Sequence, residues 1–248
     1  MSLVPSLTEL VCDLGLGPRL VGRTGFCVHP RAALSVVPKV GGTKSVDIDK
    51  VRALSPSHLI VNIDENEKPT VDALARFVPQ VIVTHPSHPL DNLELYALLG
   101  GIFGREDESK RLARQFRAEY GAATAAARGW PREPVLYLIW REPWMTVSRD
   151  TYIARTLAAV GWDTLPESAD KRYPEIELND ALLGSVKRVL LSSEPYRFRE
   201  RHVAELRARL PAGVQVELID GEMTSWYGSR AIRGLRYLAD FRAQHLDG

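Results

Sequence analysis

The chain has 248 residues, which is enough for one or two domains with a substantial hydrophobic core. Its 32 basic and 31 acidic residues nearly cancel, so it lacks the basic excess of a nucleic-acid-binding protein and no nucleic-acid partner is expected. No apolar run approaches the roughly 18 residues that a membrane-spanning helix needs, so no membrane insertion is predicted.

The first residues, MSLVPSLTEL, lead directly into an expected strand at 2–4 and an expected helix at 7–14. They lack the basic start and the long apolar stretch of a secretory leader. The chain is therefore expected to be either a cytoplasmic protein or a mature form whose leader has been removed. Ser6, with Glu9 three positions later, matches a capping box for the helix, and Gly15 and Gly17 are expected to end it.

Short apolar runs alternate with amphipathic ones along the next part of the chain. Further strands are predicted at 19–22, 58–62 and 80–84, and further helices at 48–54 and 70–77. A mostly helical stretch at 90–128 follows, with a break near Gly104. Its second part, from residue 106, has apolar residues along one face and is about 35 Å long at 1.5 Å per residue.

The alternation restarts after the helix-breaking segment GWPREP at 129–134. Strands are predicted at 134–140, 188–191 and 214–219, and helices at 151–160, 178–183, 200–210 and 230–245. This order of elements predicts the α/β class with mainly parallel sheets. We expect an N-terminal α/β lobe at 1–88, a helical segment at 89–130 that contains the long bridging helix, and a C-terminal α/β lobe at 131–248.

Nucleotide-binding and hydrolytic motifs are missing from the sequence. GLGPRLVG at 15–22 follows a helix where a dinucleotide fingerprint follows a strand, and GGTKS at 41–45 lacks the glycine before the lysine of a phosphate loop. Neither a G-x-S-x-G elbow nor an H-E-x-x-H motif occurs. We therefore expect no enzymatic activity, and the catalytic alternative is a general acid or base among Glu142, Asp220 and Glu222.

Two groups of polar residues have competing interpretations. Borderline-soft metals favour ligands such as Cys27, His29, His85 and His88. The favoured interpretation is that these side chains cap backbone groups or line a polar rim, with direct binding of a transition metal as the alternative. The second group is interpreted as the solvated face of the long helix, with a phosphate-binding patch as the alternative, and comprises Arg114, Arg117 and Arg128.

Aromatic residues lie in polar, turn-rich segments that follow predicted strands. Trp140 and Trp144 bracket a strand end in IWREPWMTV, and Trp226 and Tyr227 lie in SWYGSR before the last helix. Phe26 lies in an early loop. In open α/β sheets, ligands bind beyond the carboxyl ends of the strands. The residues alone leave two interpretations open, a wall for a ligand or a corner of the hydrophobic core.

Several segments together resemble the substrate-binding proteins of ABC importers with a helical backbone, a family that handles cobalamin, iron-siderophores and haem. The matching segments run from residue 2 to about residue 230: SLVPSLTEL, VGRTGFCVHP, PKVGGTKSVDIDKVRALSP, NIDENE, YLIWREPWMTVSRDTYI, YPEIEL, LLSSEPYRF and DGEMTSWYGSR. The resemblance implies two α/β lobes bridged by one long rigid helix, with a ligand cleft between the lobes.

The resemblance also implies which residues contact the ligand and the transporter. The first lobe would contribute Pro5, Ser6, Phe26, Gly42, Thr43, Asn62 and His85, and the second Trp140, Arg141, Trp144, Trp226 and Tyr227. Trp144 is expected to face the ligand and Trp140 to pack against its lobe, with Arg141 as a rim contact or a partner of Glu142. Docking to transporter arginines is assigned to Glu65, with Glu175 or Glu194 as the second-lobe counterpart.

By resemblance, the chain is a non-catalytic receptor for a metal-containing macrocycle, with a corrinoid such as cobalamin ranked first. Broad ring faces suit Trp and Tyr, and Arg141 suits a propionate or phosphate. Haem ranks second, with His85, His88 or Tyr227 as candidate iron ligands, and an iron-siderophore third. We expect an ABC permease dimer as partner, a monomer without a resident cofactor, and a periplasmic or cell-surface location, with a cytoplasmic one as the alternative because no leader is seen.

Overall fold

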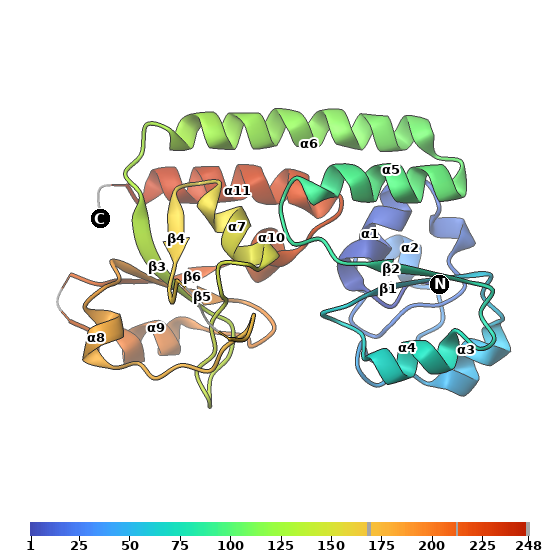
Figure 1. Ribbon diagram of the computed structural model, residues 1–248, viewed down its shortest axis with the longest axis horizontal. Coiled ribbons are helices and arrows are strands. Elements are labelled where there is room, and N and C mark those ends of the chain that lie inside the picture. The colour runs from blue at the N-terminus through green and yellow to red at the C-terminus, as the bar shows by residue number, and fades with distance from the viewer. Residues whose placement is uncertain (168–169, 212, 247–248) are drawn as a thin grey trace. The chain divides into compact units, whose positions relative to one another are not determined.

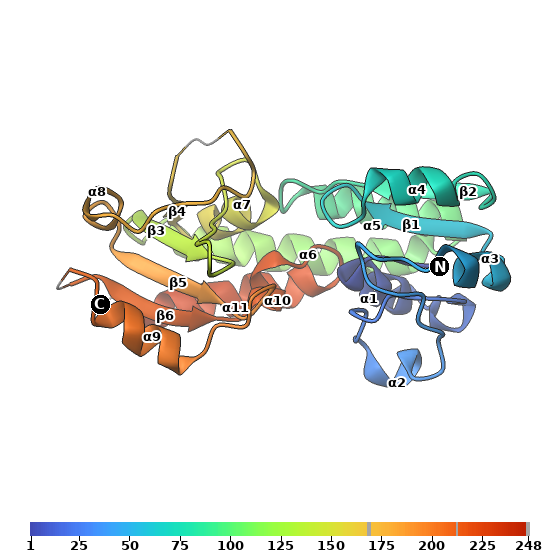
Figure 2. The same cartoon turned by 90° about the horizontal axis from the view of Figure 1, so that it is seen from below.

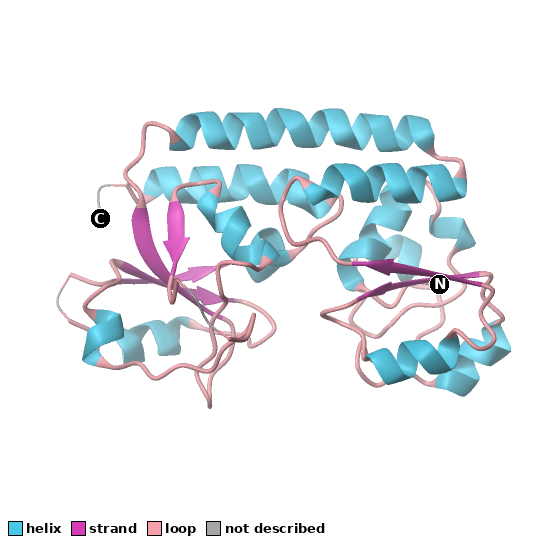
Figure 3. Cartoon of the chain, in the orientation of Figure 1, coloured by secondary structure: helices cyan, strands magenta, loops and turns pink. Residues whose placement is uncertain are grey.

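The computed structural model describes residues 1–167, 170–211 and 213–246, and the chain divides into two compact units. Unit 1 comprises Met1–Pro86, Leu90–Arg114 and Tyr227–Arg230, and unit 2 comprises Ser87–Pro89, Gln115–Trp226 and Ala231–Gly248. The strands lie in two groups, one in each unit (Figure 3). The lobe boundaries expected after residues 88 and 130 stay a prediction.

Unit 1 is built on a parallel pair of strands (Figure 1). Its elements are α1 (Pro5–Asp13), the 3-10 turn η1 (Gly17–Arg19), α2 (Arg31–Leu34), α3 (Ile48–Leu54), β1 (His58–Asn62), α4 (Lys68–Leu74), β2 (Gln80–Thr84) and α5 (Asp91–Phe103). The predicted strands at 58–62 and 80–84 agree residue for residue with β1 and β2. Both are short β-branched runs closed by polar turn residues, which is a strong strand signal.

Single parallel bridges widen this pair on the side of β1. Ser2 bridges both Ile60 and Arg23, and Arg23 in turn bridges Lys39. The strand expected at 2–4 is therefore reduced to one bridging residue, Ser2. The strand expected at 19–22 is wrong, because a 3-10 turn occupies Gly17–Arg19 and pairing begins only at Arg23.

Helix α1 begins differently from the prediction. Its first residue is Pro5 and its N-cap is Val4, which contributes no side-chain hydrogen bond. Proline fits the first helical position because its missing N–H would be unsatisfied there anyway. Ser6 therefore lies inside the helix, so the predicted capping box is wrong. Glu9 instead accepts hydrogen bonds from the buried Arg230, with Oε2 2.7 Å from its Nε.

The helical stretch breaks where the sequence predicts it. Helix α5 ends at Phe103, and Gly104 caps it in the left-handed region, with φ of 62°, where glycine is favoured. Helix α6 (Glu106–Ala127) follows and contributes residues to both units. Its predicted apolar face is confirmed by the burial of Leu112, Phe116 and Ala123. No helix in the described part of the chain combines the length and apolar character needed to cross a membrane.

Unit 2 contains a parallel sheet in the order β4-β3-β5-β6. Its elements are β3 (Glu133–Leu138), α7 (Tyr152–Ala158), β4 (Trp162–Thr164), α8 (Asp180–Leu183), β5 (Arg188–Ser192), α9 (Glu200–Arg207), β6 (Gln215–Ile219), α10 (Gly221–Ser225) and most of α11 (Arg230–Gln244). The α/β class with parallel sheets is confirmed. The sequence did not predict η1, α2, β4 or α10, none of which is longer than five residues.

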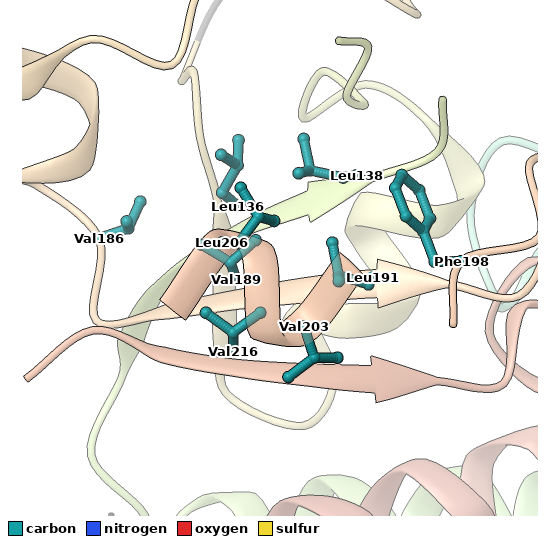
Figure 4. Packing of buried hydrophobic residues seen from close by; sticks show 9 residues of the cluster. All are labelled: Leu136, Leu138, Val186, Val189, Leu191, Phe198, Val203, Leu206 and Val216. Carbon is teal, nitrogen blue, oxygen red and sulfur yellow. The ribbon is translucent and has the colours of Figure 1, made fainter. Parts of the chain in front are cut away.

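One face of the sheet in unit 2 packs against α9. The buried cluster joins Leu136, Val189 and Val216 of three adjacent strands to Val203 and Leu206 of α9 (Figure 4). Figure 2 shows α9 running beside β6. This packing fixes the strands, and with them the loops that leave their carboxyl ends.

A buried ionic network joins the first residues of β3 and β5 to the middle of β6. Arg188 of β5 is 1% exposed, and its side chain donates to Glu133 of β3 at 2.8 Å and to Glu217 of β6 at 2.6 Å. Arg242 of α11 approaches the second oxygen of Glu133 at 2.7 Å, and His245 approaches that of Glu217 at 3.1 Å. The network pairs charges that would be costly to bury alone.

Candidate functional site

In unit 1, several predicted ligand residues follow the carboxyl ends of the parallel segments. Phe26 follows the segment at Arg23, Gly42 follows the segment at Lys39, and His85 follows β2. Phe26 is 64% exposed. A Cβ at Gly42 would lie 3.4 Å from its ring and 2.9 Å from the Ser45 hydroxyl, so glycine leaves room for both side chains.

The polar residues at this edge differ in how many of their hydrogen-bonding groups are used within the fold. Asn62 is buried, its Oδ1 accepts from the Asp64 N–H at 2.8 Å, and its amide donates to Thr84 at 3.4 Å. Its side chain therefore shapes the loop after β1. His85 is exposed, and its Nε2 lies 3.7 Å from Asp64 Oδ1. The backbone oxygen of Thr43 accepts from Asn66 at 2.9 Å.

Tyr227 belongs to unit 1 and not to the C-terminal lobe, which corrects its expected position. The segment Tyr227–Arg230 is held there by Asn92, which accepts from the Gly228 N–H at 2.6 Å, and by Tyr96, which donates to the Gly228 oxygen at 2.8 Å. Gly228 has φ of 81°, and a Cβ there would lie 3.3 Å from the Ser6 backbone oxygen. The positive φ favours glycine there, and the close approach adds to that preference.

The phenol of Tyr227 is hydrogen-bonded to Glu65. It is buried and donates to Glu65 Oε1 at 2.7 Å. Burial, with the nearby Glu65 carboxylate, raises the pKa of Tyr227 well above its ordinary value. The phenol therefore stays protonated, which is unfavourable for an iron-bound phenolate. The same bond occupies one oxygen of the glutamate that the resemblance assigned to transporter docking.

In unit 2, Trp140 is the exposed aromatic at the end of β3. It is 40% exposed, and its ring meets that of Tyr196 edge-on at 5.6 Å between centroids. Tyr196 follows β5, the strand next to β3. Because the carboxyl ends of neighbouring parallel strands meet at one edge, the two rings form one aromatic corner there.

Trp144 packs inward. Its ring stacks on Phe198 at 6.1 Å with an interplanar angle of 2°, against the hydrophobic cluster of unit 2. The two tryptophans thus pack differently, and it is Trp140 that is exposed and Trp144 that packs against the cluster, the reverse of the expected packing. A cis peptide bond between Glu142 and Pro143 lies between them.

Arg141 is neutralised by two carboxylates. Its guanidinium makes two contacts of 2.8 Å with Glu205, one from each terminal nitrogen, and one of 3.3 Å with Glu142. It also lies 5.7 Å from the ring centre of Trp144. The expected partner Glu142 is present, but Glu205 of α9 is the closer one.

Trp226 donates from its indole N–H to Glu194 at 2.6 Å, and the Ser225 hydroxyl donates to the same oxygen at 2.8 Å. Burial raises the pKa of Glu194 above its ordinary 4.5, and repulsion from Glu222 and Asp220 adds to the effect, while the two hydrogen bonds oppose it. Glu194 is therefore an internal acceptor at the end of β5. Glu175, the other docking candidate, is exposed.

The raised pKa of Glu194 makes stability depend on pH. The native fold binds this proton more tightly than the unfolded chain does, so stability falls as pH rises from the ordinary value through the raised one. Glu194→Gln keeps an acceptor oxygen and removes this decline. We expect the melting temperature of this variant to increase relative to that of the wild type as pH rises from about 4 to about 7. Differential scanning fluorimetry measures the melting temperature at each pH, and Glu175→Gln, at an exposed glutamate, is the control. A constant difference in melting temperature between the wild type and Glu194→Gln across this pH range would refute the prediction.

The metal-site and catalytic alternatives gain no support from the geometry. Cys27 is buried, and its sulfur accepts from Thr8 at 3.1 Å. Among the described residues, no group of three or more His, Cys, Asp or Glu side chains could hold a metal ion. Of the catalytic candidates, Glu142 pairs with Arg141, and Asp220 caps α10 by accepting from the Met223 N–H.

Sequence reasoning missed Tyr196, Glu205 and Ile63, which is 58% exposed after β1. Ile63 directly follows the predicted strand at 58–62 and Tyr196 lies in the loop after the one at 188–191, so the rule that singled out Trp140 would have found them. Glu205 carries no such signal, because it lies inside α9 and meets Arg141 only through the tertiary fold.

Comparisons with known proteins agree with this architecture. A sequence profile of the family described as periplasmic binding protein matches residues 1–181. The vitamin B12-binding protein of Vibrio vulnificus (strain CMCP6) is 21% identical over 192 residues, covering 77% of this chain and 70% of that protein. The crystal structure of the periplasmic vitamin B12-binding protein BtuF of Vibrio cholerae has a TM-score of 0.82 at 14% identity, covering 98% of this chain and 95% of that one.

A second solved structure of similar fold is described as a heme-binding protein. The periplasmic heme-binding protein RhuT from Roseiflexus sp. RS-1, in apo form, has a TM-score of 0.82 at 21% identity. The match covers 99% of this chain and 97% of that one. At these identities the structural likeness establishes the fold and leaves the ligand to be argued from the side chains.

Proposed function

Because the chain belongs to the periplasmic binding protein family, we propose that it is a non-catalytic solute-binding protein that captures a metal-containing macrocycle, a corrinoid first, for an ABC importer. The observation that carries this proposal is the exposed Trp140 at the carboxyl end of β3, braced edge-on by Tyr196. A large indole held by a neighbouring ring offers a flat apolar surface at little conformational cost. The macrocycle is cargo and not a resident cofactor.

The carboxyl edge of unit 1 suits the same class of ligand. Phe26 and Ile63 are exposed there, and exposed apolar side chains gathered at strand ends are typical of binding sites. The charged groups at this edge are partnered within the fold, since Asp64 lies 3.7 Å from His85 and Glu65 accepts from Tyr227. Exposed apolar contact area beside such partnered polar groups suits a corrin ring.

The charges favour a corrinoid over haem. Haem presents carboxylates, but Arg141 is already neutralised by Glu205 and Glu142. Haem also usually gains an axial protein ligand, and the Tyr227 phenol is committed to Glu65. Haem remains the second candidate because His85 is exposed at the edge of unit 1, and an iron-siderophore is the third.

An ABC permease dimer is the proposed partner, which places the protein outside the inner membrane. Exposed Glu175 is the most accessible of the three docking candidates, since Glu65 and Glu194 each accept a hydrogen bond from an aromatic residue of their own unit. A transporter arginine could still use the second oxygen of either carboxylate.

Titration of the purified protein with cyanocobalamin and with hemin tests the proposal. We expect saturable tryptophan quenching and a change in visible absorbance with cyanocobalamin at about micromolar concentration. Saturation by hemin alone would move the assignment to the second candidate. The absence of a saturable change with either ligand would remove both.

A further inference from the structure

Unit 2 contains a groove of about 490 Å³ that lies apart from the aromatic corner at Trp140. It is bordered by the segment between α6 and β3 and by the end of α7, which leads into β4 (Figure 1). The groove therefore lies near the amino ends of β3 and β4, whereas Trp140 follows the carboxyl end of β3. Ala158 and Ala159 at the end of α7 leave it open, and its volume is within the range of roughly 300–1,000 Å³ of small-molecule sites.

The lining of the groove is cationic although the whole chain is nearly neutral. Arg128, Arg132, Arg155 and His88 all line it, and none of its ten lining residues, each within the described part of the chain, is acidic. The chain as a whole has 32 basic and 31 acidic residues. The lining of the groove is thus more positive than the chain as a whole, in which basic and acidic residues are nearly equal in number.

The three arginines differ in how much charge they leave for a ligand. Arg132 is occupied, because it pairs with Asp163 and donates to the Ala158 oxygen at 3.0 Å. Arg155 donates to the backbone oxygen and to the hydroxyl of Ser87, at 3.1 and 3.0 Å, and neither acceptor is charged. Among the described residues Arg128 makes no side-chain hydrogen bond or ion pair, so Arg128 and Arg155 hold the available charge.

Two aromatic side chains complete the groove. Trp130 is half-buried between Arg128 and Arg132 in sequence, and Tyr120 of α6 is half-buried and stacks on Phe116 at 5.9 Å between ring centres. Aromatic faces bind planar rings, and guanidinium groups bind phosphate oxygens in a forked geometry. The lining therefore combines recognition of a flat ring with recognition of an anion.

We propose that this groove is a second binding site, specific for a small phosphate monoester carried on a planar ring, as in a nucleoside monophosphate. Arg128 and Arg155 contact the phosphate, and Trp130 supports the ring. Arg132 fixes this side of the groove through its bonds to Asp163 and to the Ala158 oxygen at the end of α7. The site is independent of the proposed macrocycle site.

Isothermal titration with adenosine 5′-monophosphate (AMP) at low ionic strength tests the proposal. We expect saturable binding with a Kd below about 1 mM, weaker binding of inorganic phosphate or adenosine alone, and loss of affinity as salt is added. Arg128→Glu should weaken AMP binding about tenfold or more. Trp130→Leu should weaken AMP binding without changing that of phosphate.

The matched control is Arg117→Glu, which makes the same charge change at an exposed position of α6 outside the groove. It should alter AMP affinity by less than about twofold. Equal losses in Arg128→Glu and Arg117→Glu would show non-specific attraction and overturn the proposal. So would phosphate binding as tightly as AMP, or no saturation by AMP. Cyanocobalamin titration of Arg128→Glu should be unchanged, which separates this site from the proposed function.

Discussion

Trp140→Ala is expected to weaken cyanocobalamin binding by about 2 kcal/mol or more, roughly 30-fold in Kd, while leaving the fold intact. Trp140 is exposed, and among the described residues its ring meets one other ring, that of Tyr196, edge-on. Its removal takes away contact area for the ligand and little buried core. Fluorescence or absorbance titration gives the affinity, and thermal unfolding checks the fold.

The matched variant is Trp144→Ala, for which the opposite pattern is expected. Trp144 stacks on Phe198 against the cluster of unit 2, so its truncation leaves a cavity and costs about 3 kcal/mol of stability. Ligand affinity of the folded fraction should change much less than in Trp140→Ala. If Trp144→Ala loses affinity and Trp140→Ala does not, the expectation made from the sequence was right and our assignment is wrong.

Arg188→Met is expected to reduce the free energy of unfolding by about 3–5 kcal/mol. Arg188 is 1% exposed and neutralises Glu133 and Glu217, one on each neighbouring strand. Methionine fills much of the volume but leaves these carboxylates short of a partner, and a buried charge without compensation is costly. Urea denaturation followed by circular dichroism measures the loss.

Arg209→Met is the control for that experiment. Arg209 pairs with Glu205 at 4.0 Å, but its side chain is 56% exposed, so its loss should cost less than about 1 kcal/mol. Similar losses in the two variants would mean that burial does not set the energy of the network. The strands would then be held mainly by the hydrophobic cluster.

Local sequence patterns predicted much of the fold. Strands β1 and β2 and helix α3 have the predicted bounds, because apolar runs with clear period and polar or capping ends decide them locally. The break at Gly104 followed from one residue that adopts the left-handed region. The segment at 19–22 was predicted wrongly because a Gly-Pro turn outweighs a short apolar run.

Only those site residues that follow a predicted strand end could be proposed from the sequence. The rule that ligands bind there singled out Trp140 and Trp144, and the family resemblance added His85. Which tryptophan is exposed depends on Phe198 and Tyr196, which follow another strand and meet these rings only in the folded unit. Neutralisation of Arg141 by Glu205 is likewise a tertiary contact between a strand end and a helix. No periodicity or spacing in one sequence encodes such pairs.

Isothermal titration calorimetry of the purified protein with cyanocobalamin and, in parallel, with hemin distinguishes the two leading ligands. We predict one equivalent of cyanocobalamin per chain with a Kd of about 1 µM or below, and weaker binding of hemin, because Arg141 is already paired. Stoichiometric binding of hemin without any heat from cyanocobalamin would contradict the corrinoid assignment. No binding of either ligand would contradict the macrocycle proposal as a whole.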